Sequence, residues 1–251
     1  MSFIKINGTN INYLELNPEA DETILMLHGM LSNMAVFYLS NASKLAEKFH
    51  VVLYDFKSHG MSEFAKSGYD FRSMAEEMLE LIEKLHLKKL HTTGYSYGGL
   101  VTLYTLIHYP GIINKAAIIE APNPNMGEHM TPQQYGRDLI LQEAETYSDS
   151  TQIKVSNRKL DKLNALTELL LSKSTFADDI CLFRNFFEEI QESDIPNETL
   201  LLYGNQSVCI DAGYLLHQYI KNSQLFIGEG NHNIPVQSPK WITEKLSDFF
   251  F

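Results

Sequence analysis

Cysteine is scarce in this 251-residue chain, which has only Cys181 and Cys209, far apart in the sequence. Their spacing matches neither a disulfide framework nor a zinc motif, so we expect two free, buried thiols and no metal. Excess positive charge is lacking too, because 20 basic residues stand against 31 acidic ones and the formal net charge is −11. Without a basic run to follow a phosphate backbone, nucleic acid is not expected as a partner.

Long apolar segments are also missing. No stretch approaches the roughly 20 apolar residues that span a bilayer, and the first residues lack the charged region and apolar core of a secretion signal. We therefore expect a cytoplasmic protein without a membrane span. With 44% hydrophobic and 20% charged residues, the chain can bury one large core, which indicates one domain carrying an insertion.

Strand and helix patterns alternate over most of the length, and this rhythm is typical of a parallel sheet covered by helices on both faces. The expected fold is α/β, with an eight-stranded, mostly parallel sheet flanked by helices. The expected strands cover residues 3–6, 11–16, 24–27, 51–54, 90–93, 115–119, 199–203 and 224–227. The expected helices of this layered part include residues 36–49, 71–87 and 239–250.

The alternation stops between residues 122 and 196, where helical patterns over 132–145, 160–171 and 178–190 follow one another without a convincing strand. We interpret this segment as a helical cap inserted after the sixth strand, so that residues 1–121 and 197–251 form the core. In α/β proteins ligands bind outside the carboxyl ends of the strands. A cap at that edge would shape a substrate pocket.

The most informative motif is Gly94-Tyr95-Ser96-Tyr97-Gly98, a G-x-S-x-G pattern between a strand-like and a helix-like segment. Small residues on both sides of the serine allow a turn so tight that the hydroxyl stands exposed at its apex. The pattern is common by chance, so the context decides. Ser96 is our candidate nucleophile because His28-Gly29 lies upstream and His232 lies near the end of the chain.

A serine hydroxyl needs a base to remove its proton. Among nine histidines, His232 stands out because its loop follows the last expected strand, which places it at the same edge of the sheet as Ser96. An acyl-transfer intermediate also needs donors for its oxyanion, and we expect these to be the backbone N–H groups of Met30 and Tyr97.

A further motif covers residues 55–62, which read Asp55-Phe56-Lys57-Ser58-His59-Gly60-Met61-Ser62. It is similar to the D-x-R-G-x-G-x-S stretch that follows the fourth strand in one large enzyme family. Over nearly its whole length the chain resembles the α/β-hydrolase superfamily. The resemblance implies a serine nucleophile, a histidine base and an acid. Lys57 and Ser58 replace the usual arginine and glycine, and we expect these changes only to reshape a loop.

The acid departs from the family pattern. Most members carry aspartate three residues after the glycine that ends the seventh strand, and here that place holds Ser207. Two carboxylates stand between Ser96 and His232 in the required order. Glu120 follows the sixth strand, as in some haloalkane dehalogenases, whereas Asp211 could simply begin a helix. We favour Glu120, with Asp211 as the alternative acid and a dyad without an acid still open.

The expected function is that of a serine hydrolase that cleaves a carboxylic ester through an acyl-enzyme, with no metal or organic cofactor. Dehalogenation is disfavoured because it uses an aspartate nucleophile. The substrate would be a small acyl ester bound in a pocket lined by Met34, Tyr95 and Met126. Alternatives are a thioesterase or acyltransferase that acts on chains bound to an acyl carrier protein, a cofactor-free lyase or C–C hydrolase, and a non-hydrolysing small-ligand receptor.

Overall fold

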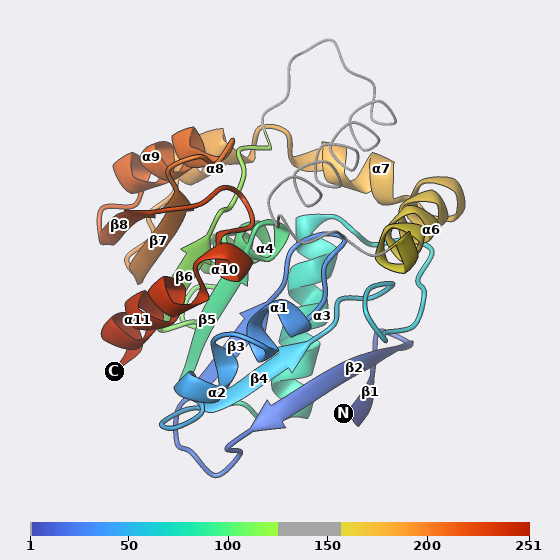
Figure 1. Ribbon diagram of the computed structural model, residues 1–251, viewed down its shortest axis with the longest axis horizontal. Helices are drawn as coiled ribbons and strands as arrows, with labels where there is room; N and C mark the ends of the chain where they lie inside the picture. The colour runs from blue at the N-terminus through green and yellow to red at the C-terminus, as the bar shows by residue number, and fades with distance from the viewer. Residues whose placement is uncertain (1, 125–156) are drawn as a thin grey trace.

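The computed structural model describes residues 2–124 and 157–251. In this part of the chain eight strands form one sheet in the order β1-β2-β4-β3-β5-β6-β7-β8 (Figure 1). The strands are β1 (Ser2–Ile6), β2 (Thr9–Leu16), β3 (Thr23–Leu27), β4 (His50–Tyr54), β5 (Leu90–Tyr95), β6 (Lys115–Ile119), β7 (Glu198–Gly204) and β8 (Ser223–Gly228). Only β2 pairs antiparallel, with β1 and β4, and the other pairs are parallel. The expected eight-stranded α/β fold is confirmed.

Helices cover both faces of the sheet, which explains why every residue of the central strands β3, β4 and β5 is buried. Successive residues of β3 point to opposite faces: Leu25 and Leu27 belong to one core cluster, and Ile24 and Met26 to the other. The first cluster includes residues of α3 (Phe71–Lys84) and α4 (Tyr97–His108), and the second includes residues of α2 (Ala42–Leu45) and α11 (Pro239–Phe250). Figure 1 shows α3 and α11 on opposite sides of the sheet.

The expected helix over 36–49 is wrong. Residues 36–49 form two short helices, α1 (Ala35–Tyr38) and α2, instead of one continuous helix. The break lies where Ser40 and Asn41 use their side chains. The Ser40 hydroxyl donates to the carbonyl of Val36 at 2.6 Å, and Asn41 Nδ2 donates to Thr243 Oγ1 in α11 at 2.6 Å. Such side-chain bonds compete with helix continuation.

Between β6 and β7 the described residues form α6 (Asn157–Lys173), α7 (Phe176–Ile180), the 3₁₀ turn η1 (Cys181–Phe183) and α8 (Phe186–Glu192). The expected helix over 160–171 is confirmed by α6. The expected helix over 178–190 is wrong, because α7, η1 and α8 divide this range, and the aromatic rings of α7 and α8 pack against different partners. Phe176 packs on Tyr69 with ring centroids 5.3 Å apart, and Phe186 packs on Phe71 at 5.1 Å.

The expected helix over 132–145 and the candidate pocket residue Met126 lie outside the described residues. The division into a core and a cap therefore stays a prediction. Every helix in the described ranges is too short or too polar to cross a bilayer.

Candidate active site

Ser96 alone occupies the turn between β5 and α4, with φ 52° and ψ −119°. This backbone conformation is strained for a residue with a side chain, and such strain is concentrated at functional sites. Two glycines make the turn possible. A Cβ at Gly94 would lie 2.4 Å from the carbonyl oxygen of Gly98, and a Cβ at Gly98 would lie 2.3 Å from that of Leu27 in β3. The turn therefore packs directly against the end of β3.

His232 lies in the loop between β8 and α10 (Ile234–Gln237). Its Nε2 atom is 3.0 Å from Ser96 Oγ, and both side chains are buried. Tyr95 holds this loop in place, because its hydroxyl donates to the backbone carbonyl of His232 at 3.1 Å. The structure thus brings the predicted nucleophile and base into hydrogen-bond contact across 136 positions of sequence.

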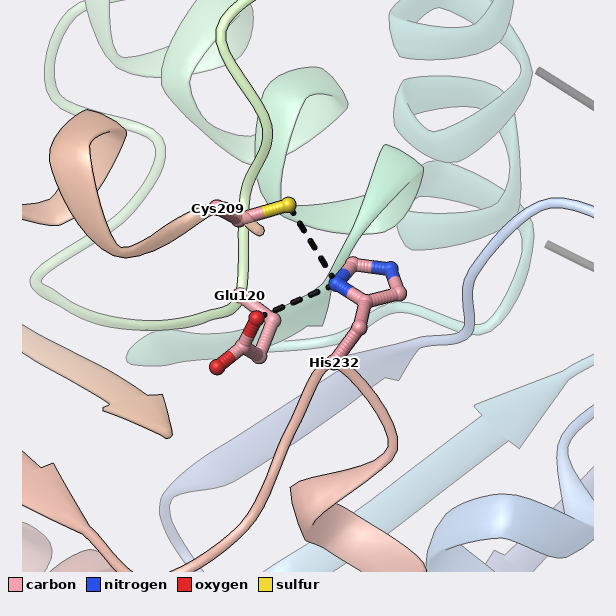
Figure 2. Close-up of side chains that lie close together, drawn as sticks. All are labelled: Glu120, Cys209 and His232. Carbon is pink, nitrogen blue, oxygen red and sulfur yellow. Dashed lines mark hydrogen bonds and ion pairs between the residues drawn. The ribbon is translucent and has the colours of Figure 1, made fainter. Parts of the chain in front are cut away.

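Glu120 directly follows β6 and, like Ser96, has a left-handed backbone, with φ 56°. Its carboxylate is fully buried, and Oε2 lies 3.1 Å from His232 Nδ1 (Figure 2). The same carboxylate accepts a hydrogen bond from the backbone N–H of Gly204 at 2.5 Å and another from the hydroxyl of Ser207. Every carboxylate oxygen therefore has a partner, as a buried charge requires.

Asp211, the alternative acid, is exposed in the first turn of α9 (Ile210–Tyr219). Within the described ranges it makes no hydrogen bond or ion pair with His232. The position of the imidazole thus matches Glu120 and not Asp211.

Cys209 also contacts the imidazole, a role that the sequence motifs did not predict. Its Sγ lies 3.4 Å from His232 Nδ1, so that Nδ1 faces both the thiol and the Glu120 carboxylate, as Figure 2 shows. The only signal in the sequence is position: Cys209 comes two residues after Ser207, which stands where the family usually places its acid. Its expected burial is confirmed, whereas Cys181 is only half-buried.

Burial alone would lower the pKa of the His232 imidazole, because burial disfavours a charge. The neighbouring Tyr95 and Cys209 oppose this effect, as do the hydrogen bonds that Cys209 and Glu120 make to the ring. The pKa of His232 is therefore raised well above its usual range. Among these neighbours, Glu120 supplies the carboxylate that can balance the charge of an imidazolium.

The loop after β3 lies against Ser96, the predicted nucleophile, because a Cβ at Gly29 would come within 3.1 Å of Ser96 Cβ. Across residues 2–124 and 157–251, the backbone N–H groups of Met30 and Tyr97 donate to no carbonyl or side chain. Both groups therefore remain candidates for the predicted oxyanion donors. The Tyr97 side chain points elsewhere, since its hydroxyl donates to the carbonyl of Tyr69.

His28 fixes this loop from within. Its Nδ1 donates to the carbonyl of Gly29 at 2.6 Å, and its Nε2 accepts from the backbone N–H of Phe56 at 2.9 Å. Burial, together with the nearby His59, lowers the pKa of His28 to about 3. A neutral ring that both donates and accepts therefore joins the loops after β3 and β4.

The remaining candidates from the sequence are buried. Met34 and Tyr95 are both buried in the second core cluster. Asp55, which we expected to be structural, accepts hydrogen bonds from the backbone N–H groups of Met34 and Met61 and from the amide of Asn12. It therefore connects the loops after β3 and β4, and its side-chain bonds within the described residues run to these loops and to Asn12 instead of to Ser96, His232 or Glu120.

The family model described as alpha/beta hydrolase fold matches residues 22–248. The chain belongs to this family. It is similar to a probable alcohol acetyltransferase of Wickerhamomyces anomalus, at 26% identity over 98% of this chain and 83% of that protein. It is also similar to the uncharacterized hydrolase YugF of Bacillus subtilis, at 22% identity over 97% of this chain and 95% of that protein.

Among solved structures, an esterase (EaEST) from Exiguobacterium antarcticum superimposes with a TM-score of 0.74 and 21% identity, covering 99% of this chain and 98% of that one. At this level of identity the likeness shows a shared fold.

Proposed function

We propose that this protein is a serine hydrolase that cleaves a carboxylic ester of a small molecule through an acyl-enzyme intermediate. One observation carries the proposal: Ser96 Oγ, both ring nitrogens of His232 and the Glu120 carboxylate form a continuous chain of contacts, at 3.0 Å and 3.1 Å. A serine, a histidine and an acid in this arrangement activate the hydroxyl for attack on a carbonyl carbon.

In the first half of the reaction, Ser96 Oγ attacks the ester carbonyl while His232 Nε2 takes the hydroxyl proton. The tetrahedral oxyanion is held by the N–H groups of Met30 and Tyr97. When it collapses, the bond to the leaving oxygen breaks and Nε2 returns the proton to that oxygen. An alcohol departs, and the acyl group stays on Ser96.

In the second half, a water molecule attacks the acyl carbon and His232 accepts its proton. Collapse of the second tetrahedral intermediate breaks the bond to Ser96 Oγ, which recovers a proton from Nε2. The products are a carboxylic acid and a free enzyme. Glu120 stabilises the imidazolium in both halves, and its own position is held by Gly204 and Ser207.

This chemistry uses only groups of the chain itself and calls for no cofactor. The acyl group would lie against the apolar side chains near the β3 loop, with Met30, Met34 and Tyr95 as candidates, all of them buried. An ester with an apolar acyl group is therefore the substrate class that we propose.

Acyl transfer to an alcohol is a second candidate. The relative named as a probable alcohol acetyltransferase aligns with 98% of this chain. The two activities share the acyl-enzyme and differ only in whether water or an alcohol attacks it. Incubation with an activated ester and an added alcohol separates them, because a transferase releases the new ester in preference to the free acid.

Covalent labelling tests the proposal directly. A fluorophosphonate reacts with an activated serine, so we expect wild-type protein to be labelled and Ser96→Ala to be unlabelled. Ser43→Ala, which changes an exposed serine on α2, is the matched control and keeps its label. If the folded wild-type protein neither reacts with the probe nor turns over esters, a non-hydrolysing receptor becomes the better description.

A further inference from the structure

Two side-chain atoms that can bind a metal, a sulfur and an oxygen, lie next to the Nδ1 atom of His232, which can bind a metal as well. Cys209 Sγ lies 3.4 Å from Nδ1, Glu120 Oε2 lies 3.1 Å from the same nitrogen, and the ligating atoms of this cluster all lie within 4.8 Å of one another. Figure 2 shows that the thiol and the carboxylate approach the ring from different directions. They come from separate segments of the chain, so the fold alone makes this cluster.

The spacing suits zinc. Tetrahedral Zn²⁺ with bonds of about 2.0–2.3 Å to nitrogen, oxygen and sulfur holds its ligand atoms about 3.4–3.6 Å apart. The two contacts to Nδ1, 3.4 Å and 3.1 Å, lie near this range, and the third separation, from Cys209 Sγ to Glu120 Oε2, is at most 4.8 Å. A sulfur, a nitrogen and an oxygen ligand together favour zinc and similar cations over Mg²⁺ or Ca²⁺, which prefer oxygen alone.

We propose that Cys209, His232 and Glu120 form an inhibitory binding site for Zn²⁺. Binding displaces the proton of the Cys209 thiol to solvent, together with the Nδ1 proton when the His232 ring is a cation, and uses the Nδ1 lone pair of His232. The proton of the neutral ring then resides on Nε2, which faces Ser96 Oγ. An Nε2 that already carries a proton cannot accept another from the serine, so the bound cation stops the first chemical step.

This effect on catalysis rests on the proposed function, whereas the binding site itself does not. Three protein ligands leave the fourth position of the metal to water. The bound ion is thus an inhibitor that prevents His232 from acting as the base, and the active enzyme does not contain it.

Binding is tested with Co²⁺, whose bond to a thiolate produces a charge-transfer absorption band. The measurement uses the full-length Ser96→Ala protein, because it needs no activity. We expect a saturable band that is abolished in Ser96→Ala/Cys209→Ala and kept in Ser96→Ala/Cys181→Ala, which removes the only other cysteine. Addition of Zn²⁺ should displace the Co²⁺ band. A missing band, or one that survives loss of Cys209, overturns the site.

Inhibition is tested by titrating ester hydrolysis with Zn²⁺, each variant relative to its own rate in EDTA. We expect Cys209→Ala to require at least about tenfold more Zn²⁺ for half-inhibition than wild type, with Cys181→Ala unchanged and EDTA restoring activity. Equal sensitivity of wild type and Cys209→Ala contradicts the proposal. A Co²⁺ band in Ser96→Ala that depends on Cys209, together with a wild-type protein that hydrolyses no ester, would uphold the site and reject the proposed function.

Discussion

Ser207 donates its hydroxyl hydrogen to the carboxylate of Glu120, and so couples the loop after β7 to the acid that follows β6. The same hydroxyl oxygen accepts the backbone N–H of Cys209 at 3.0 Å. Ser207 therefore stands beside the oxygen that contacts His232, in the place where the family usually carries its acid. Glu120, which follows β6, and Ser207, which follows β7, therefore lie at the same place beside the His232 ring.

The acid assignment predicts unequal effects of two substitutions. Glu120→Gln keeps the size of the side chain but removes the charge that stabilises the imidazolium, so we expect kcat to fall by about 10³–10⁴-fold. Asp211→Asn, at an exposed position, should stay within about twofold of wild type. Steady-state hydrolysis of p-nitrophenyl esters measures both. Near-wild-type rates for both variants would leave no role for an acid at position 120.

Moving the carboxylate provides a stricter test. In Glu120→Ala/Ser207→Asp the carboxyl group of the new aspartate replaces the Ser207 hydroxyl, which now bonds Glu120 Oε2. Glu120 Oε2 is the atom that contacts His232 Nδ1, so the new carboxylate lies near that nitrogen. We expect the double variant to recover at least about tenfold in kcat over Glu120→Ala, because the charge beside the imidazolium returns. Glu120→Ala/Asp211→Glu is the control, since it also retains a carboxylate in the chain but on the exposed face of α9. Equal kcat values for the two double variants would argue that a carboxylate at position 207 cannot take the place of Glu120.

The raised pKa of His232 predicts the pH dependence of catalysis. A protonated ring cannot take the Ser96 proton, so kcat/KM should rise with pH through the pKa of His232, with a midpoint above the usual 6.5. Glu120→Gln removes a group that favours the cation, and its midpoint should therefore move to lower pH on top of its lower plateau. The profiles are measured in buffers that contain EDTA. A midpoint that stays at the wild-type value in Glu120→Gln would assign the titration to another group.

The features of the fold and the candidate site that could be predicted from the sequence are those set by neighbouring residues or by the order of the strands. The turn at Ser96 is encoded by neighbours, because Gly94 and Gly98 are the residues that its close contacts require. Strand ends meet at one edge of a parallel sheet, so the order of the strands predicted that His232 and Glu120 could approach Ser96. These inferences used only spacing and topology.

Contacts between distant side chains gave no such signal. The break in the expected helix over 36–49 depends on Asn41 reaching Thr243, 202 positions away. The contact of Cys209 with His232 depends on how the loop after β7 bends over the ring, and Ser207 gained its partner only because Glu120 lies beside that loop. A loop conformation set by tertiary contacts is not readable from composition or periodicity.

The neutral state of His28 predicts how stability varies with pH. Its pKa is about 3 in the folded protein against a reference value of 6.5, so the unfolded chain takes up a proton first as pH falls. The stabilisation from the neutral ring is complete above about pH 6.5 and is lost progressively toward pH 3, by an amount on the order of a few kcal/mol. His28→Gln cannot titrate, while its amide can still accept from Phe56 N–H. We expect this variant to lose less of its unfolding free energy between pH 7 and pH 4.5 than wild type does, as measured by urea denaturation. His217→Gln, at an exposed site on α9, should keep the wild-type pH dependence, and a His28→Gln protein with the same dependence would place the acid sensitivity elsewhere.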